Sequence, residues 1–201
     1  MMKGILMQPT QVKALMTGGK PRIARGFAGQ RKAVAGLYWA HVLRPEMGRM
    51  IPDRAGRALV RRGLQSGRVL VALAADGAVL GCAGLRGAEG GAVILPPARL
   101  RHIAGQPAAW ALHLWRGGPV SGDLVLDGLA VAPFARRQGI ARALLHAALY
   151  EAAAQGYPGL RVELRPANHA ALALYHAEGF APVTRARIGW GGKALILRRD
   201  V

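Results

Sequence analysis

Residues 123–145 read "DLVLDGLAVAPFARRQGIARALL" and place a strand pattern, an arginine-glycine turn and a helix pattern next to one another. The apolar run up to Pro133 predicts a strand, and the alanines and leucines after Gly139 predict a helix that ends near Gly156. Such a turn leaves backbone N–H groups without partners and directs the positive end of the helix dipole outward, which favours a phosphate group. From these residues alone, an ordinary turn with solvated arginines is an equally good interpretation.

The patterns on either side predict a mixed sheet with helices on both faces, because a strand-helix-strand-helix order follows an antiparallel start. Asp76-Gly77 joins two apolar runs and is a strong short-range hairpin signal. In chain order, the expected elements are a strand at 21–29, helices at 29–46 and 53–67, hairpin strands at 68–76 and 77–87, a strand at 123–133, a helix at 136–157, a strand at 160–166, a helix at 168–180 and a closing hairpin at 181–200. Residues 87–121 are expected to be an insertion with an amphipathic helix around Trp110 and Trp115.

Length and composition limit the class of protein. The 201 residues fit one compact domain, which we expect at 21–201 after a flexible tail at 1–20. A single cysteine, Cys82, excludes an internal disulfide and favours a reducing compartment, so we expect the protein in the cytoplasm. The apolar window around Asp76-Gly77 indicates a hairpin and not a membrane span.

The formal net charge is +18, and arginine supplies most of the basic residues. This charge implies attraction to polyanions, which include nucleic acid, acidic protein surfaces and phosphorylated cofactors. Charge alone does not choose among these partners.

Two motifs together resemble one known family, the GNAT N-acetyltransferases, which transfer an acetyl group from acetyl-CoA to an amine. The cofactor motif V-x-P-x-x-R-x-x-G-x-G/A stands here as "VAPFARRQGIA", residues 131–141, and the motif N-x-x-A-x-x-x-Y-x-x-x-G-F stands as "NHAALALYHAEGF", residues 168–180. The C-terminal half is similar to ribosomal-protein alanine N-acetyltransferases. The resemblance implies an α/β GNAT fold, with a mixed, mostly antiparallel twisted sheet flanked by helices.

The resemblance also implies which residues bind acetyl-CoA. The backbone of Leu129, Ala130 and Val131 would pair with the pantetheine arm, and the loop around Gly139 would hold the pyrophosphate. Asn168 would cap its helix and contact the cofactor. Arg137 and Ala141 stand where the family commonly has glycine. The loop residues assigned to the cofactor are Arg136, Arg137, Gln138, Gly139, Ile140, Ala141 and Arg142.

The chemistry requires an acid, because the departing thiolate needs a proton. Tyr175 stands where many members of the family carry the phenol that donates it. The alternative is a core tyrosine, since Ala171, Leu172 and Tyr175 share one helical face. The two interpretations are compatible if that face covers the cofactor.

A base is also required, because amines are mostly protonated at neutral pH. Glu163 resembles the proton acceptor of ribosomal-protein alanine N-acetyltransferases. Strand alternation places it with Arg161 and Arg165, so a solvated charged stripe is the alternative. Asp127 lies between apolar residues on an expected central strand, where an unpaired carboxylate is costly, and this favours a role facing the active site.

No metal site is expected, since His169 and His176 lack a third ligand and Cys82 lies in an apolar strand. A solvated helix face is the first interpretation of one basic cluster; if it faced the acceptor, an acidic acceptor or RNA would be favoured. That cluster comprises Arg49, Arg54, Arg57, Arg61 and Arg62.

We therefore expect direct transfer of an acetyl group from acetyl-CoA to a primary amine of a small molecule or protein, without a metal. The alternatives are a non-catalytic acyl-CoA sensor, a basic RNA-binding protein, and acetylation of aminoacyl-tRNA. The expected partners are acetyl-CoA and an amine acceptor, either neutral or acidic. Nucleic acid is less favoured, a membrane is not expected, and a homodimer is an open alternative.

Overall fold

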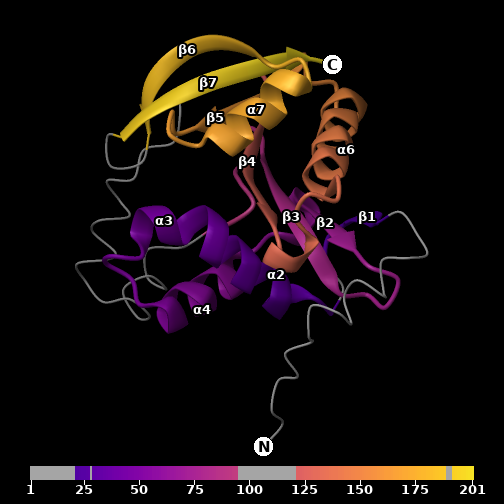
Figure 1. Cartoon of the computed structure of the whole chain (residues 1–201), viewed down its shortest axis with the longest axis vertical. Coiled ribbons are helices and arrows are strands. Elements are labelled where there is room, and N and C mark those ends of the chain that lie inside the picture. The colour runs from indigo at the N-terminus through magenta and orange to yellow at the C-terminus, as the bar shows by residue number, and fades with distance from the viewer. Residues whose placement is uncertain (1–20, 28, 95–120, 189–191) are drawn as a thin grey trace, which may run out of the picture.

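The computed structural model describes residues 21–27, 29–94, 121–188 and 192–201, and within them seven strands form one mixed sheet (Figure 1). The strand order is β1-β2-β3-β4-β5-β7-β6. All neighbouring strands are antiparallel except β4 and β5, which are parallel. The strands are β1 (Arg22–Arg25), β2 (Val69–Leu73), β3 (Val79–Arg86), β4 (Leu124–Val131), β5 (Gly159–Leu164), β6 (Ala181–Ile188) and β7 (Gly192–Asp200).

Helices cover both faces of the sheet (Figure 1). On β2, Val69 and Val71 pack with one group of helices, whereas Leu70 and Ala72 point to the other side and join a second core. The first group is α2 (Arg31–Tyr38), the π-helical turn η1 (Trp39–Leu43), α3 (Arg44–Met47) and α4 (Asp53–Gly63), and the second is α6 (Ile140–Ala154) and α7 (His169–Ala177). Short 3₁₀ turns, η2 (Ser66–Arg68) and η3 (Pro133–Ala135), precede β2 and follow β4. The expected mixed, mostly antiparallel sheet with helices on both faces is confirmed.

The predicted hairpins are also confirmed. β2 and β3 pair antiparallel around the Asp76-Gly77 turn, in which the Asp76 carboxylate accepts a hydrogen bond of 2.9 Å from the Ala78 N–H. β6 and β7 form the closing antiparallel pair.

Three helices differ from the prediction. The helix expected at 53–67 ends at Gly63. The helix expected from residue 136 begins at Ile140, because Arg137 (φ +62°) and Gly139 (φ +75°) adopt left-handed conformations that no α-helix accommodates. The helix expected at 29–46 is interrupted by the π-turn at Trp39–Leu43. π-turns often mark functional sites, and this one faces β4.

Several expectations fall outside the described residues. These are the tail at 1–20, the amphipathic helix around Trp110 and Trp115, and most of the insertion predicted at 87–121. The single-domain assignment stays a prediction. Among the residues described, no helix is long and apolar enough to cross a membrane.

Candidate active site

Strands β4 and β5 pair at their beginnings and then part. Their ladder runs from Leu124–Leu160 to Leu126–Val162, although β4 continues to Val131. The backbone groups of residues 129–131 that point away from β3 therefore have no ladder partner among the described strands. We call this region the fork: residues 127–131 of β4 and residues 163–164 of β5. A free strand edge of this kind is what the predicted pairing with pantetheine requires.

A bulge in β4 accompanies the fork. Leu126 pairs with Leu85 and Gly128 with Gly84, so Asp127 is an extra residue without a partner on β3. Gly128 has φ +145°, and a Cβ there would lie 2.7 Å from Val42 Cγ1 of the π-turn. The hydroxyl of Tyr38 donates a hydrogen bond of 2.5 Å to the Asp127 carbonyl. The first helical layer and a glycine together hold the bulge in place.

The turn before α6 presents unsatisfied backbone donors. No acceptor within the described residues bonds the amides from Arg137 to Arg142, and α6 has no side-chain N-cap. Successive amides around left-handed residues form a concave anion site, which the helix dipole strengthens. The turn is exposed from residue 136 to residue 139. A phosphate group would fit here.

The arginines of this turn are not equally available. Arg136 and Arg137 are exposed, and Arg136 Nε donates a hydrogen bond of 3.4 Å to the Val131 carbonyl, whereas Arg142 forms an ion pair with Glu178 at the end of α7. Glu178 also contacts His146, at 2.6 Å, and these two partners hold the pKa of Glu178 below its ordinary value. The Arg142 guanidinium is thus partly neutralised, and its backbone amide is the group that fits the predicted role.

A cluster of charges occupies the fork on the α2–α4 side of the sheet. One arginine, Arg86 at the end of β3, contacts both candidate bases: its Nε lies 3.2 Å from Asp127 Oδ1 and its Nη2 lies 3.1 Å from Glu163 Oε2. Arg161 Nη2 contacts the other oxygen of Glu163 at 2.7 Å. The structure thus brings together Asp127 and Glu163, which are far apart in the sequence. Arg86 was not among the residues predicted from the sequence.

The solvated stripe considered for β5 is wrong for two of its three residues. Arg161 is only 4% exposed and the side chain of Glu163 only 9%. Arg165 is exposed and forms an ion pair with Glu46 of α3. Burial of a paired carboxylate at the fork is costly and points to a role other than solubility.

Asp127 is the more accessible of the two candidate bases. Its side chain is 32% exposed, and its second oxygen lies over Gly91, where an added Cβ would come within 2.6 Å. Burial raises the pKa of Asp127 above its ordinary value, although Arg86 and a hydrogen bond from the Ala92 amide act in the opposite direction. A carboxylate with a raised pKa accepts a proton more readily than a free aspartate.

Tyr175 lies on α7 and is 6% exposed, with its ring 5.5 Å from that of Phe180. Burial raises its pKa, so the hydroxyl stays protonated. Within the described part of the chain, that hydroxyl makes no hydrogen bond. Tyr175 is therefore a core residue that retains a proton to donate, and both interpretations of this residue are compatible with the structure.

Asn168 caps α7 as predicted, since its Oδ1 accepts a hydrogen bond of 3.3 Å from the Ala171 amide. Its contact with the cofactor stays a prediction.

The remaining candidates are surface or core residues. His169 and His176 are exposed, and Cys82 is buried with its pKa raised to about 12. Among the described residues, no group of three or more His, Cys, Asp and Glu side chains could hold a metal ion. The basic residues of α4 and its neighbourhood, Arg49, Arg54, Arg57, Arg61 and Arg62, are all exposed.

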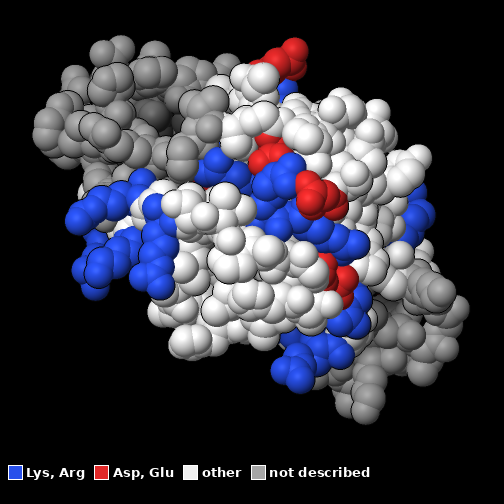
Figure 2. Space-filling view, turned by 90° about the horizontal axis from the view of Figure 1, so that it is seen from above, with Lys and Arg blue, Asp and Glu red and all other residues white. Residues whose placement is uncertain are grey.

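The positive charge is unevenly distributed. Figure 2 shows acidic side chains among basic ones along the middle of the face seen from above, and basic side chains without acidic neighbours at its left end. In Figure 1 the β6–β7 hairpin ends on that side, and it carries the exposed residues Arg185, Arg187 and Lys193.

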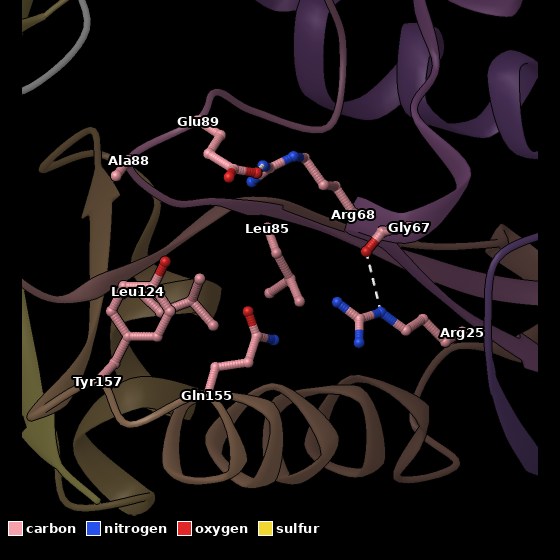
Figure 3. Close-up of a pocket in the computed structure, with 9 residues that line it drawn as sticks. All are labelled: Arg25, Gly67, Arg68, Leu85, Ala88, Glu89, Leu124, Gln155 and Tyr157. Atoms are coloured by element: carbon pink, nitrogen blue, oxygen red, sulfur yellow. Dashed lines mark hydrogen bonds and ion pairs between the residues drawn. The ribbon is translucent and has the colours of Figure 1, made fainter.

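A cavity of about 470 Å³ lies at the opposite end of β4, away from the fork (Figure 3). Leu85 and Leu124 form part of its apolar lining, and the Gln155 amide and the Tyr157 ring lie beside them (Figure 3). The arginines of this cavity are neutralised: Arg25 pairs with Glu151 at 3.1 Å, and Arg68 pairs with Glu89 at 2.9 Å. The other lining residues are Gly67 and Ala88.

Comparisons with known proteins agree with this fold. The model of the Acetyltransferase (GNAT) family matches residues 37–180, which include the fork, the turn before α6 and Tyr175. No protein among the curated ones matches the chain.

Solved structures share the fold at low sequence identity. An N-acetyltransferase from Staphylococcus aureus Mu50 matches with a TM-score of 0.67 and 17% identity, over 89% of this chain and 100% of that one. The ribosomal-protein-S18-alanine N-acetyltransferase from Escherichia coli matches with a TM-score of 0.55 and 19% identity, over 90% and 94%. A NatC complex bound to Gag peptide and CoA matches with a TM-score of 0.56 and 16% identity, over 91% and 99%.

Proposed function

The chain belongs to the GNAT acetyltransferase family, and from this premise we propose that it transfers the acetyl group of acetyl-CoA directly to a primary amine of a small molecule or protein at the fork. The observation that carries the proposal concerns the described residues: beyond Leu126, β4 has no strand partner on the side away from β3, and the amides from Arg137 to Arg142 have no hydrogen-bond acceptor. These groups have the chemistry that a pantetheine amide and a pyrophosphate require. On that edge of β4 the Val131 carbonyl accepts a hydrogen bond of 3.4 Å from Arg136 Nε, so this arginine would have to move for pantetheine to pair there. When bound, acetyl-CoA supplies the acyl group as a thioester.

Three side chains are candidates for the proton transfers: two for the base and one for the acid. We infer that Asp127 accepts the proton of the incoming ammonium group, directly or through a water molecule, because its side chain is the more exposed of the two carboxylates. Glu163 is the alternative that the family resemblance favours, but guanidinium groups contact both of its oxygens. The Tyr175 hydroxyl donates a proton to the departing sulfur. Because the pKa of Tyr175 is raised, the hydroxyl keeps this proton until it is needed.

The acceptor is proposed by class only. The E. coli structural neighbour acetylates an alanine of a ribosomal protein, so peptides that begin with alanine belong in an acceptor screen beside free amino acids and polyamines. Acidic peptides belong there too, because the net charge of +18 favours anionic partners. We also propose a cytoplasmic setting, since Cys82 is a free, buried thiol, and a homodimer that a measurement of solution mass would detect.

The first experiment is a calorimetric titration with acetyl-CoA at two salt concentrations, with ATP as the control polyphosphate. We expect binding that is selective for acetyl-CoA and survives added salt, because hydrogen bonds from backbone amides are screened less than surface charges. Binding no tighter than that of ATP, and lost with salt, would reject the cofactor site and favour a polyanion-binding scaffold.

The acceptor screen then separates an enzyme from a sensor. Release of free thiol in the presence of an amine is expected for the enzyme, and tight acetyl-CoA binding without thiol release would indicate an acyl-CoA sensor. Acetylation of aminoacyl-tRNA would require RNA binding that weakens steeply with salt.

A further inference from the structure

We propose that Arg86 is the positioning residue of the acceptor site, where its guanidinium holds the carboxylates of Asp127 and Glu163 together across the fork. The proposal rests on the proposed acetyl transfer and deepens it, since it says how two strands that no longer pair present one binding site to an amine.

The geometry of β3, β4 and β5 gives Arg86 this position. Arg86 is the last residue of β3 and pairs with Val125, just before the bulge. Its Nε and Nη2 contact different carboxylates, at 3.2 and 3.1 Å, one on β4 and one on β5. Beyond Leu126 no ladder hydrogen bond joins these two strands in the described chain, so the guanidinium replaces the missing backbone link. The planar guanidinium of arginine can contact two carboxylates at once. A lysine ammonium on a flexible stem would not hold both in place.

Among the contacts of the described residues, the cluster holds as many guanidinium groups as carboxylates. Two guanidinium groups, of Arg86 and Arg161, face two carboxylates, of Asp127 and Glu163. Other polar groups of the described residues near the fork have partners of their own: Arg165 pairs with Glu46, the Tyr38 hydroxyl donates to the Asp127 carbonyl, and Arg136 Nε donates to the Val131 carbonyl. An ammonium group that enters adds one positive charge, which favours transfer of its proton to a carboxylate.

Loss of Arg86 would leave two carboxylates near one another with one cation fewer. Arg86 lowers the pKa of Asp127 and the nearby Glu163 raises it, so the Asp127 carboxyl would titrate at higher pH without Arg86. The acidic limb of the rate profile would move in the same direction.

The chain offers a matched control at the other end of β4. Arg68 is similarly enclosed, with 23% of its side chain exposed against 27% for Arg86, and it also pairs with a glutamate (Figure 3). Arg68 lies in the cavity away from the fork and contacts neither Asp127 nor Glu163. Comparison of the two variants therefore separates the effect of removing any enclosed arginine from the effect of removing the arginine that contacts Asp127 and Glu163.

The test compares native protein with Arg86→Gln, Arg86→Lys and Arg68→Gln. The Asp127 and Glu163 carboxyl carbons are followed by NMR during a pH titration, and kcat/KM is measured against pH with the best amine of the acceptor screen. For Arg86→Gln we expect one carboxyl to titrate about one pH unit or more higher, kcat/KM to fall roughly 10²-fold, and acetyl-CoA affinity to change less than about twofold. Arg86→Lys should restore the pH titration of the carboxyls more fully than it restores kcat/KM. Arg68→Gln should match native protein in both the carboxyl titration and kcat/KM.

Two results would overturn the proposal: native carboxyl titrations in a folded Arg86→Gln protein, or a native kcat/KM in that variant. An equal effect of Arg68→Gln would also overturn it. Failure of native protein to acetylate any amine would instead reject the proposed function, so the two failures are distinguishable.

Discussion

The two ends of β4 use charged side chains in opposite ways. At its start, β4 pairs with both β3 and β5, and the nearby arginines are neutralised by glutamates on a helix and a turn (Figure 3). At its end, β4 no longer pairs with β5. There one arginine contacts two carboxylates that belong to the strands, Asp127 of β4 and Glu163 of β5. Carboxylates on central strands are costly to bury, so the fold keeps them where the ladder is interrupted. This difference is the one expected if the fork carries the proposed acetyl transfer and the other end contributes to stability alone.

The largest effect on the fork is expected from Gly128→Val, which would disrupt the bulge in β4. A side chain there would collide with Val42 and Tyr38 at a φ of +145°, so we expect a loss of about 3 kcal/mol in the free energy of unfolding and loss of acetyl-CoA binding. Urea unfolding and calorimetry measure the two effects. Gly122→Ala, just before β4, is the control, because a Cβ there meets nothing within 4 Å. A stable Gly128→Val protein with native cofactor affinity would contradict the role given to the bulge.

Substitution of the carboxylates should affect rate more than stability. Asp127→Asn is expected to lower kcat/KM roughly 10²- to 10³-fold and to abolish the acidic limb of its pH profile. Because the pKa of Asp127 is raised, that limb in native protein lies above the ordinary aspartate range near pH 3.9, with activity increasing as pH rises through it. If Glu163→Gln abolishes the limb and Asp127→Asn leaves it unchanged, Glu163 is the base.

Tyr175→Phe should separate catalysis from packing at the core face of α7. The ring stays in the core, so we expect kcat to fall by roughly 10- to 10²-fold while acetyl-CoA affinity stays within about twofold. The raised pKa of Tyr175 predicts no decline of native activity from its ionisation up to about pH 10. Tyr150→Phe, at an exposed position on α6, is the control. An unchanged kcat would remove Tyr175 as the acid.

The smallest effect is expected at the turn before α6. Arg137 has φ +62°, so Arg137→Gly should relieve backbone strain and stabilise the protein by about 0.5–1 kcal/mol, while weakening acetyl-CoA binding a few-fold at low salt. Arg136→Gly removes the same charge at φ −70° and should give no such gain in thermal stability. Equal stability changes in the two variants would show that the left-handed conformation costs little.

The motifs of the sequence predicted most of the fold and part of the site. The glycine turn, the capping Asn168 and the order of strands and helices depend on neighbouring residues, and the structure places them as expected. Gly128, a glycine inside a strand pattern beside an acid, carried a signal of a bulge that the strand prediction did not use. Arg86 carried no comparable signal, because an arginine at the end of an apolar strand is ordinarily solvated.

The sequence by itself determined the resemblance to the family and singled out the glycine turn before α6 as a candidate phosphate site. The candidate acid and bases follow from that resemblance, whose motifs are local. Only the tertiary structure decided that Asp127 and Glu163 share one arginine and that β5 leaves β4 at the bulge. The physical reason is that register and ion pairing between strands depend on which faces are buried. Arg86, Asp127 and Glu163 lie on three adjacent strands, and only the folded sheet brings them within hydrogen-bonding distance.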